Sequence, residues 1–158
     1  MSIGIFGGSF NPVHRGHLKL ARAALSKLRL DKIVFVPSRR SPLKKKEDLL
    51  PAALRVKLLR SALKDQKRFF ISLCEIQRKG PSYTVDTLKA FKRKWGKGTE
   101  LFFLSGADTL KGLSRWKSLD EIFKLCRFVV MTRPRYRVGK MPQPVFLWSR
   151  RGNTYGNT

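Results

Sequence analysis

The strongest indication of the fold is the stretch Gly7-Gly8-Ser9-Phe10-Asn11-Pro12-Val13-His14-Arg15-Gly16-His17. An apolar run, Ile3–Phe6, precedes it and predicts a short buried strand, and the residues that follow predict a helix. The apolar face of that helix carries Leu18, Ala21, Leu25 and Leu28. A glycine-rich turn between a strand and a helix presents backbone N–H groups at the carboxyl edge of a sheet, where they can bind an anion.

Both histidines of the chain lie in this stretch, three residues apart. At that spacing, His14 and His17 can point the same way from the start of a helix. Two imidazole donors beside backbone N–H groups suit the charge that develops on a phosphoryl group during its transfer. The stretch matches neither the GxxxxGK[ST] phosphate-binding loop nor the GxGxxG dinucleotide fingerprint. No cysteine or carboxylate stands at ligand spacing around the histidines, so we expect no metal site there.

The motif GGSFNPVHRGH resembles the HxGH signature of the nucleotidyltransferase superfamily. Its particular form is similar to the GGSF(N/D)P-x-H-x-GH of the nicotinate-mononucleotide adenylyltransferases. Those enzymes join a pyridine mononucleotide to the AMP part of ATP and release pyrophosphate. The resemblance implies that His14 and His17 stabilise the α-phosphate of ATP. It also implies an ATP-binding role for the turn residues Gly7, Gly8, Ser9, Phe10 and His17.

A basic loop follows the second apolar run, Lys32–Pro37, which predicts a strand. In the family that this sequence resembles, a PxxPHK-like run lies here and its lysine meets the ATP phosphates. Lys44 matches that lysine, whereas Leu43 stands where many relatives have a histidine. The resemblance therefore implies a catalytic role for Lys44. The alternative is a basic loop that is merely solvated.

The segment Gly80–Leu88 turns sharply and then predicts a helix, with Ser82 as its expected N-cap. The sequence GPSYTVDTL closely resembles the second signature of the same family. There, the residues at the helix start lie against the pyridine nucleotide, which implies that Ser82, Tyr83 and Thr84 bind the mononucleotide. Without the resemblance, Ser82 and Thr84 are capping residues and Asp86 complements the helix dipole.

An acidic residue follows the expected strand Glu100–Leu104. A carboxylate just beyond a strand and next to a glycine can accept hydrogen bonds from ribose hydroxyls. The GAD motif of the family falls here, which implies that Gly106 and Asp108 take part in ATP binding. Trp116 follows in a polar loop, where it either packs beneath the loop or offers a flat face for stacking. The RW motif of the family implies that Trp116 stacks on the nicotinate ring.

Strands that alternate with helices predict a doubly wound α/β fold of the Rossmann type, with a mostly parallel sheet in a single domain.

We expect residues 1–134 to form the nucleotidyltransferase domain and residues 135–158 to form an atypical basic C-terminal tail. The ISSTxIR motif and the C-terminal helix of the family are absent, and one strand-like run together with Ser149-Arg150 is the only similarity to them. The last seven residues are expected to be a frayed end. A truncated or frame-shifted product and a natural variant are both consistent with this tail. The remaining expected strands are Phe69–Leu73 and Arg127–Met131.

The charge of this 158-residue chain is extreme, because 35 basic and 10 acidic residues give a formal net charge of +25. Such a surface can steer a small polyanion such as ATP toward a cleft. It can also bind nucleic acid, although basic residues spread along the chain indicate at most non-specific binding. The sequence has no membrane-length apolar run and no secretory signal, so we expect a cytoplasmic protein without a membrane partner. Its oligomeric state stays open.

We therefore predict adenylyl transfer from ATP to nicotinate mononucleotide, giving deamido-NAD and pyrophosphate, with Mg²⁺ accompanying ATP. The predicted catalytic residues are His14, His17 and Lys44. Two alternatives stay open. A different HxGH nucleotidyltransferase, such as the pantetheine-phosphate type, would share the histidines but not GPSYTVDTL. A catalytically impaired, basic, RNA-associated descendant would keep the fold and lose turnover. The sequence also leaves open the preference between nicotinate and nicotinamide mononucleotide, and whether the chain is competent without ISSTxIR.

Overall fold

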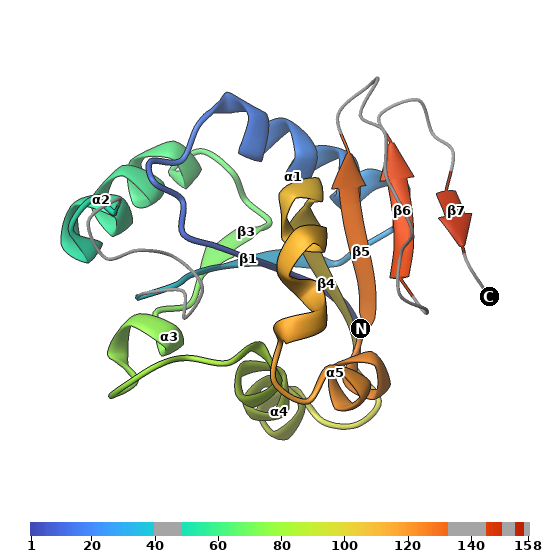
Figure 1. The fold of residues 1–158 in the computed structure, drawn as a ribbon. Helices are drawn as coiled ribbons and strands as arrows, with labels where there is room; N and C mark the ends of the chain where they lie inside the picture. Colours follow the sequence, from blue (N-terminus) through green and yellow to red (C-terminus); the bar gives the residue numbers. More distant parts are fainter. Residues whose placement is uncertain (40–48, 133–144, 150–153, 157–158) are drawn as a thin grey trace.

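The computed structural model describes residues 1–39, 49–132, 145–149 and 154–156. It contains a seven-stranded sheet with the strand order β3-β2-β1-β4-β5-β6-β7 (Figure 1). Neighbouring strands from β3 through β6 are parallel, and β7 is antiparallel to β6. The strands are β1 (Ser2–Gly8), β2 (Lys32–Pro37), β3 (Phe69–Ile71), β4 (Glu100–Gly106), β5 (Arg127–Thr132), β6 (Val145–Ser149) and β7 (Thr154–Gly156). The predicted doubly wound, mostly parallel α/β fold is therefore confirmed.

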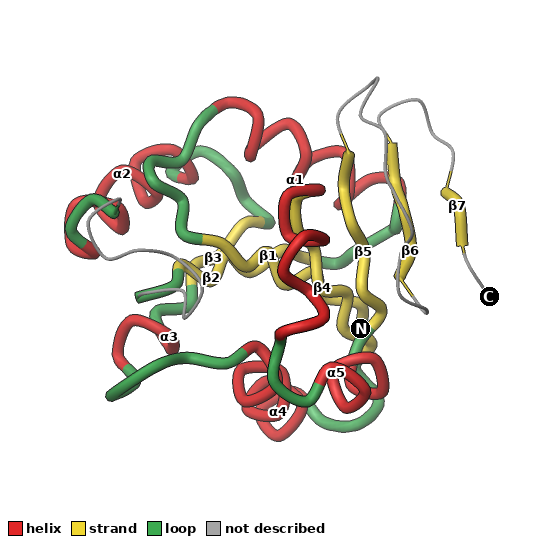
Figure 2. Tube along the Cα trace, viewed as in Figure 1, coloured by secondary structure: helices red, strands yellow, loops and turns green. Residues whose placement is uncertain are grey.

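Helices cover both faces of this sheet (Figure 2). They are α1 (Arg15–Lys27), α2 (Ala52–Leu63), α3 (Cys74–Gln77), α4 (Thr84–Trp95), the 3-10 helix η2 (Ala107–Arg115) and α5 (Leu119–Leu125). Helices α1 and α2 lie on one side of the sheet, and α4 and α5 lie on the other (Figure 1). Among the described residues, no helix is both long enough and apolar enough to cross a membrane.

Two apolar clusters form the core, one on each face of the sheet. In β2, Ile33 and Phe35 pack into the cluster under α1 and α2, whereas Val34 and Val36 pack into the cluster under α4 and α5. Alternate side chains of a strand point to opposite faces, so a strand covered on both faces must be apolar throughout. This explains why the strands appear in the sequence as continuous apolar runs.

The strand order reverses direction at β1. The chain passes from β1 to β2 on one side, and β4 pairs with β1 on the other. The connections that leave the carboxyl ends of β1 and β4 therefore depart to opposite faces of the sheet, which opens a crevice between them. The glycine-rich turn and the segment Gly106–Asp108 both leave from this crevice.

Three local predictions are wrong. Tyr83 occupies the N-cap position of α4, because the Ser82 hydroxyl donates a hydrogen bond to the carbonyl oxygen of Glu75 at 3.1 Å instead of capping the helix. The expected frayed end contains a strand, β7, whose backbone pairs with β6. The strand expected over Phe69–Leu73 ends at Ile71, since the chain turns there into the short helix α3.

Candidate active site

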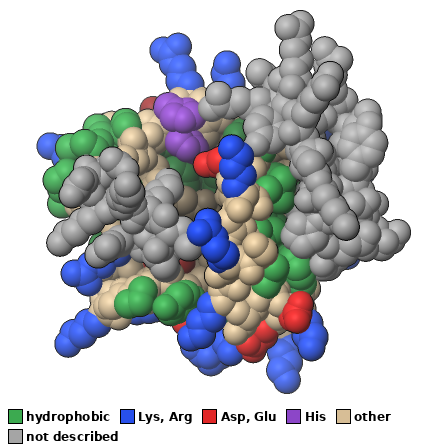
Figure 3. Space-filling model, in the orientation of Figure 1, with side chains coloured by type: hydrophobic (Ala, Val, Ile, Leu, Met, Phe, Trp, Pro, Cys, Tyr) green, Lys and Arg blue, Asp and Glu red, His purple; other side chains and the backbone are tan. Residues whose placement is uncertain are grey.

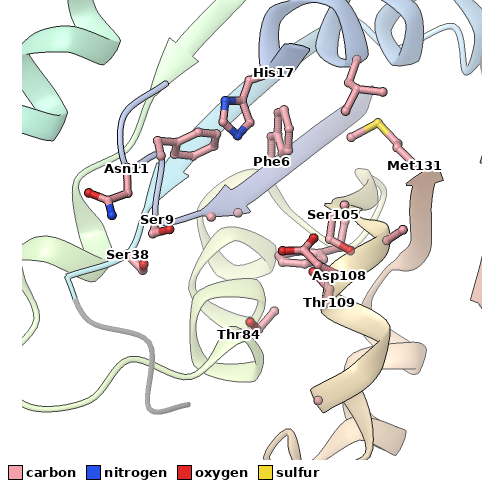
Figure 4. Close-up of a pocket in the computed structure, with 18 of the residues that line it drawn as sticks. Phe6, Ser9, Asn11, His17, Ser38, Thr84, Ser105, Asp108, Thr109 and Met131 are labelled. Carbon is pink, nitrogen blue, oxygen red and sulfur yellow. The ribbon is translucent and has the colours of Figure 1, made fainter. Parts of the chain in front are cut away.

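A cleft of about 1330 Å³ opens at the carboxyl ends of β1 and β4 (Figure 4). Its walls come from the turn between β1 and α1, the start of α4, and the segment from β4 through η2. Twelve of the thirteen site residues predicted from the sequence line this one cleft, and the remaining one, Lys44, lies outside the described residues. The twelve are Gly7, Gly8, Ser9, Phe10, His14, His17, Ser82, Tyr83, Thr84, Gly106, Asp108 and Trp116. The structure thus brings these residues together, while the role of each stays a prediction.

The two histidines form a capping box at the start of α1. His14 is the N-cap residue, and its Nδ1 accepts a hydrogen bond from the Gly16 N–H at 3.1 Å. The His14 N–H in turn donates to Nδ1 of His17, also at 3.1 Å. A neutral imidazole whose Nδ1 accepts a hydrogen bond carries its proton on Nε2. Both rings are therefore fixed in the tautomer that donates through Nε2.

A layer of phenyl rings supports His17 from below. Phe10 is only 2% exposed and meets His17 edge-on, with ring centroids 5.1 Å apart. Its backbone has a φ of 45°, which is unusual for a bulky residue. The ring also packs against Phe6 and Phe35, with centroids 5.3 and 5.5 Å away. The Phe10 side chain therefore acts as a core support beneath the histidine.

On the opposite wall, polar side chains leave the end of β4. Asp108 lies in the first turn of η2, close to Ser105 and Thr109 (Figure 4). A Cβ on Gly106 would come within 2.8 Å of Oδ1 of Asp108, so glycine leaves room for this carboxylate. Ser105 is 2% exposed, and among the described residues its hydroxyl is the buried side-chain group with no hydrogen-bond partner. The sequence did not predict Ser105 as a site residue, because a single serine within an apolar strand matches no functional motif.

Trp116 packs against the core and also lines the cleft. Its ring meets Phe103 and Phe128 edge-on, with centroids 5.8 and 5.7 Å away. The half-buried ring also lines the cleft. Nearby, the ammonium group of Lys117 lies 4.7 Å from the centre of the Tyr83 ring. Two aromatic rings and one cation thus line this end of the cleft, which suits a flat, negatively charged ligand.

A polar network that the sequence did not reveal underlies the start of α4. The Thr87 hydroxyl donates to Oε1 of Glu75 at 2.8 Å, and Arg78 donates to the same hydroxyl at 3.2 Å. Burial raises the pKa of the Glu75 carboxyl, although the Thr87 hydrogen bond and the Arg78 charge oppose this shift. Glu75 also lines the cleft. Because Ser82 donates to the Glu75 carbonyl, the network fixes the turn before Tyr83 and Thr84.

The family model described as cytidylyltransferase-like matches residues 5–154, which agrees with the doubly wound fold and with a cleft at the carboxyl ends of its strands. A protein of Bacillus subtilis (strain 168) named nicotinate-nucleotide adenylyltransferase is 40% identical over 143 residues, which cover 90% of this chain and 75% of that protein. A protein of Clostridium novyi with the name "Probable nicotinate-nucleotide adenylyltransferase" is 43% identical over a stretch that covers 87% of this chain and 68% of that protein. This chain belongs to the nicotinate-nucleotide adenylyltransferase family.

A solved structure supports the fold. The nicotinic acid mononucleotide adenylyltransferase of Plasmodium falciparum, complexed with NaAD, superimposes with a TM-score of 0.75 at 18% sequence identity. The match covers 94% of this chain and 74% of that one. The chain spans about two thirds of the length of its curated relatives, for example 66% of the one from Clostridium acetobutylicum.

Proposed function

We propose that this chain transfers the adenylyl group of ATP to nicotinate mononucleotide, giving deamido-NAD and pyrophosphate. The observation that carries the proposal is the pair of imidazoles whose Nδ1 atoms both accept backbone N–H groups at the start of α1. This arrangement leaves Nε2 of each ring as its donor nitrogen, beside the positive end of a helix dipole. Membership of the nicotinate-nucleotide adenylyltransferase family supports the choice of substrates.

In this reaction, the phosphate of the mononucleotide is itself the nucleophile. One of its oxygens bonds to the α-phosphorus of ATP, and the bond from that phosphorus to the oxygen bridging to the β-phosphate breaks. Pyrophosphate leaves, so no side chain has to form a covalent intermediate. The protein acts by holding the reactants in line and by stabilising the negative charge that spreads over the α-phosphoryl oxygens. In our proposal, His14 and His17 donate to those oxygens.

The two ends of the cleft are proposed to hold different substrates. The turn Gly7–Phe10 and Asp108 would bind ATP, with the carboxylate accepting hydrogen bonds from ribose hydroxyls. Trp116 would stack on the pyridine ring, next to Tyr83 and Thr84 at the start of α4. Lys44 keeps its predicted role at the ATP phosphates, which the described residues do not test.

We expect Mg²⁺ to enter this cleft together with ATP. Within the described ranges, no three histidine, cysteine, aspartate or glutamate side chains come together as a metal cage. Mg²⁺ commonly binds through substrate phosphates and water together with one or two carboxylates, and Asp108 and Glu75 both line this cleft. When bound, Mg²⁺ would neutralise part of the charge on the leaving pyrophosphate.

Pyrophosphate release with different acceptors tests the proposal. The chain is incubated with ATP and Mg²⁺ and with nicotinate mononucleotide, nicotinamide mononucleotide or phosphopantetheine in turn. We expect the highest kcat/KM with nicotinate mononucleotide. Release with phosphopantetheine alone would favour a different HxGH nucleotidyltransferase, and release with none would favour the RNA-associated descendant.

A further inference from the structure

Arg55 is a buried cation that the proposed reaction does not explain. It lies in the first turns of α2, is 1% exposed, and is thus among the most deeply buried large side chains described. The two ion pairs that the described residues form, Lys89–Glu121 and Arg127–Glu100, do not include it. A buried charge without an opposite charge is costly unless its donors are well satisfied.

Four backbone carbonyls satisfy this guanidinium group instead. Its Nη1 donates to the carbonyl oxygens of Ser9 and Ser38, each at 2.7 Å. Its Nη2 donates to the carbonyl of Arg39 at 3.1 Å, and its Nε donates to the carbonyl of Leu50 at 2.9 Å. The acceptors come from three separate segments, so the planar fork of one side chain joins parts of the chain that are far apart in sequence.

These segments surround one side of the cleft. Ser9 belongs to the glycine-rich turn that leads to the histidines, and Ser38 follows the carboxyl end of β2; both line the cleft, on the same side of it (Figure 4). Leu50 is tied to the same turn a second time, because its N–H donates to Oδ1 of Asn11 at 2.8 Å. The turn after β1 and the connection after β2 thus have a common anchor behind the proposed phosphate site.

We propose that Arg55 is a positioning residue for ATP: it fixes the turn after β1 relative to Ser38 and Arg39, which follow β2, so that Ser9 and Ser38 keep their places on the side of the cleft proposed for ATP. This rests on the ATP-binding part of the proposed function. The guanidinium group acts through the carbonyls of Ser9 and Ser38 and has no direct contact with substrate. Leu59, also fully buried in α2, contacts the core instead and provides a matched control.

Equilibrium binding of a non-hydrolysable ATP analogue tests this role, with Arg55→Met, Arg55→Lys and Leu59→Ala compared at temperatures where each variant is folded. A misplacement of about 1 Å can cost about 100-fold, so we expect Arg55→Met to raise the Kd of the analogue at least about tenfold. Arg55→Lys retains the charge but not the fork and should fall between Arg55→Met and the wild type. The Kd for nicotinate mononucleotide should stay within about threefold for all variants, because Arg55 holds the carbonyl of Ser9 in the turn assigned to ATP and has no hydrogen bond to the start of α4. Hydrogen exchange should quicken at residues 9–11 and 38–39 in the Arg55 variants, but not selectively in Leu59→Ala.

Equal weakening of both ligands, or an ATP effect no larger in the Arg55 variants than in Leu59→Ala, would show that Arg55 only stabilises the fold. If Arg55→Met does not fold, Arg55→Lys alone decides, since it preserves the buried charge. These readouts need no turnover. A chain that binds the analogue but makes no deamido-NAD would refute the proposed reaction and leave the role of Arg55 to be judged from binding.

Discussion

His14 and His17 lie ring against ring, with centroids 3.8 Å apart and planes inclined by 32°, and the backbone N–H of His14 donates to Nδ1 of His17. The two rings are therefore held together by the backbone hydrogen bonds at the start of α1. His14 also caps α1, which means that a simple deletion of its side chain removes two functions at once. The histidines stand at the edge of a hollow in the face shown in Figure 3.

Substitution of His14 can separate capping from catalysis. Asparagine is a good N-cap but lacks the Nε2 donor, whereas alanine lacks both. We expect His14→Asn to keep the free energy of unfolding near that of the wild type, and His14→Ala to lose about 0.5–2 kcal/mol. Both should lose about 100-fold or more in kcat, as should His17→Ala, because each removes a donor to the transition state. Near-normal turnover in His14→Asn, with unchanged thermal unfolding, would rule out the phosphate contact.

Trp116→Ala should affect the two substrates unequally. Stacking of a flat ring on an aromatic side chain is worth roughly 1–3 kcal/mol, by analogy with nucleobases. We therefore expect the KM for nicotinate mononucleotide to rise far more than the KM for ATP. Trp116→Phe, which keeps an aromatic face, is the matched control. Equal losses for both substrates would mean that Trp116 only packs against Phe103 and Phe128.

Glu75 should give the fold a characteristic pH dependence. Burial raises the pKa of its carboxyl in the folded state above the ordinary value of 4.5, which applies to the unfolded state. At a pH between the unfolded-state and folded-state pKa values, the folded protein therefore holds a proton that the unfolded chain has lost. The free energy of unfolding should therefore fall as the pH rises through that window. Glu75→Gln keeps an acceptor for Thr87 and removes the titration. Denaturant unfolding from about pH 4 to 8 should show the wild type losing stability relative to this variant as the pH rises. Parallel curves would contradict the shift.

The charge of +25 allows a test of the nucleic-acid alternative. Basic side chains are spread around the visible face rather than gathered in one patch (Figure 3). An electrostatically steered enzyme should lose kcat/KM for ATP only moderately as salt rises. A dedicated duplex binder would instead lose affinity steeply, with a slope near −0.9 for each phosphate contact. At physiological ionic strength, where screening acts over about 8 Å, we expect weak RNA and duplex binding in a filter or fluorescence assay. Tight RNA binding without pyrophosphate release would overturn the enzymatic account.

Much of the fold was predictable because its strands are buried on both faces and so appear as continuous apolar runs, as in Lys32–Pro37. The short elements were not. Strand β3 ends at Ile71 and helix α3 begins at Cys74, although the sequence predicts a strand that continues to Leu73. Strand β7 has only three residues and is defined by backbone pairing with β6, which leaves no periodic pattern in the sequence.

The same contrast holds for the site. The glycine-rich turn and its histidines act through local geometry, so their motif predicted the cleft that they line. Arg55 and Glu75 act through distant partners: Arg55 donates to the carbonyls of Ser9 and Ser38, and Glu75 accepts from Thr87. In the sequence, Arg55 is one basic residue among many on an amphipathic helix, and nothing local shows that it is buried. Such residues become visible only when the three-dimensional contacts are known.

Product analysis tests the central claim most directly. The chain is incubated with ATP, Mg²⁺ and nicotinate mononucleotide, and the products are separated and identified by mass. The account predicts deamido-NAD and pyrophosphate in equal amounts, with neither formed when nicotinate mononucleotide is omitted. Formation of ADP and phosphate, or pyrophosphate without the dinucleotide, would contradict adenylyl transfer to the mononucleotide.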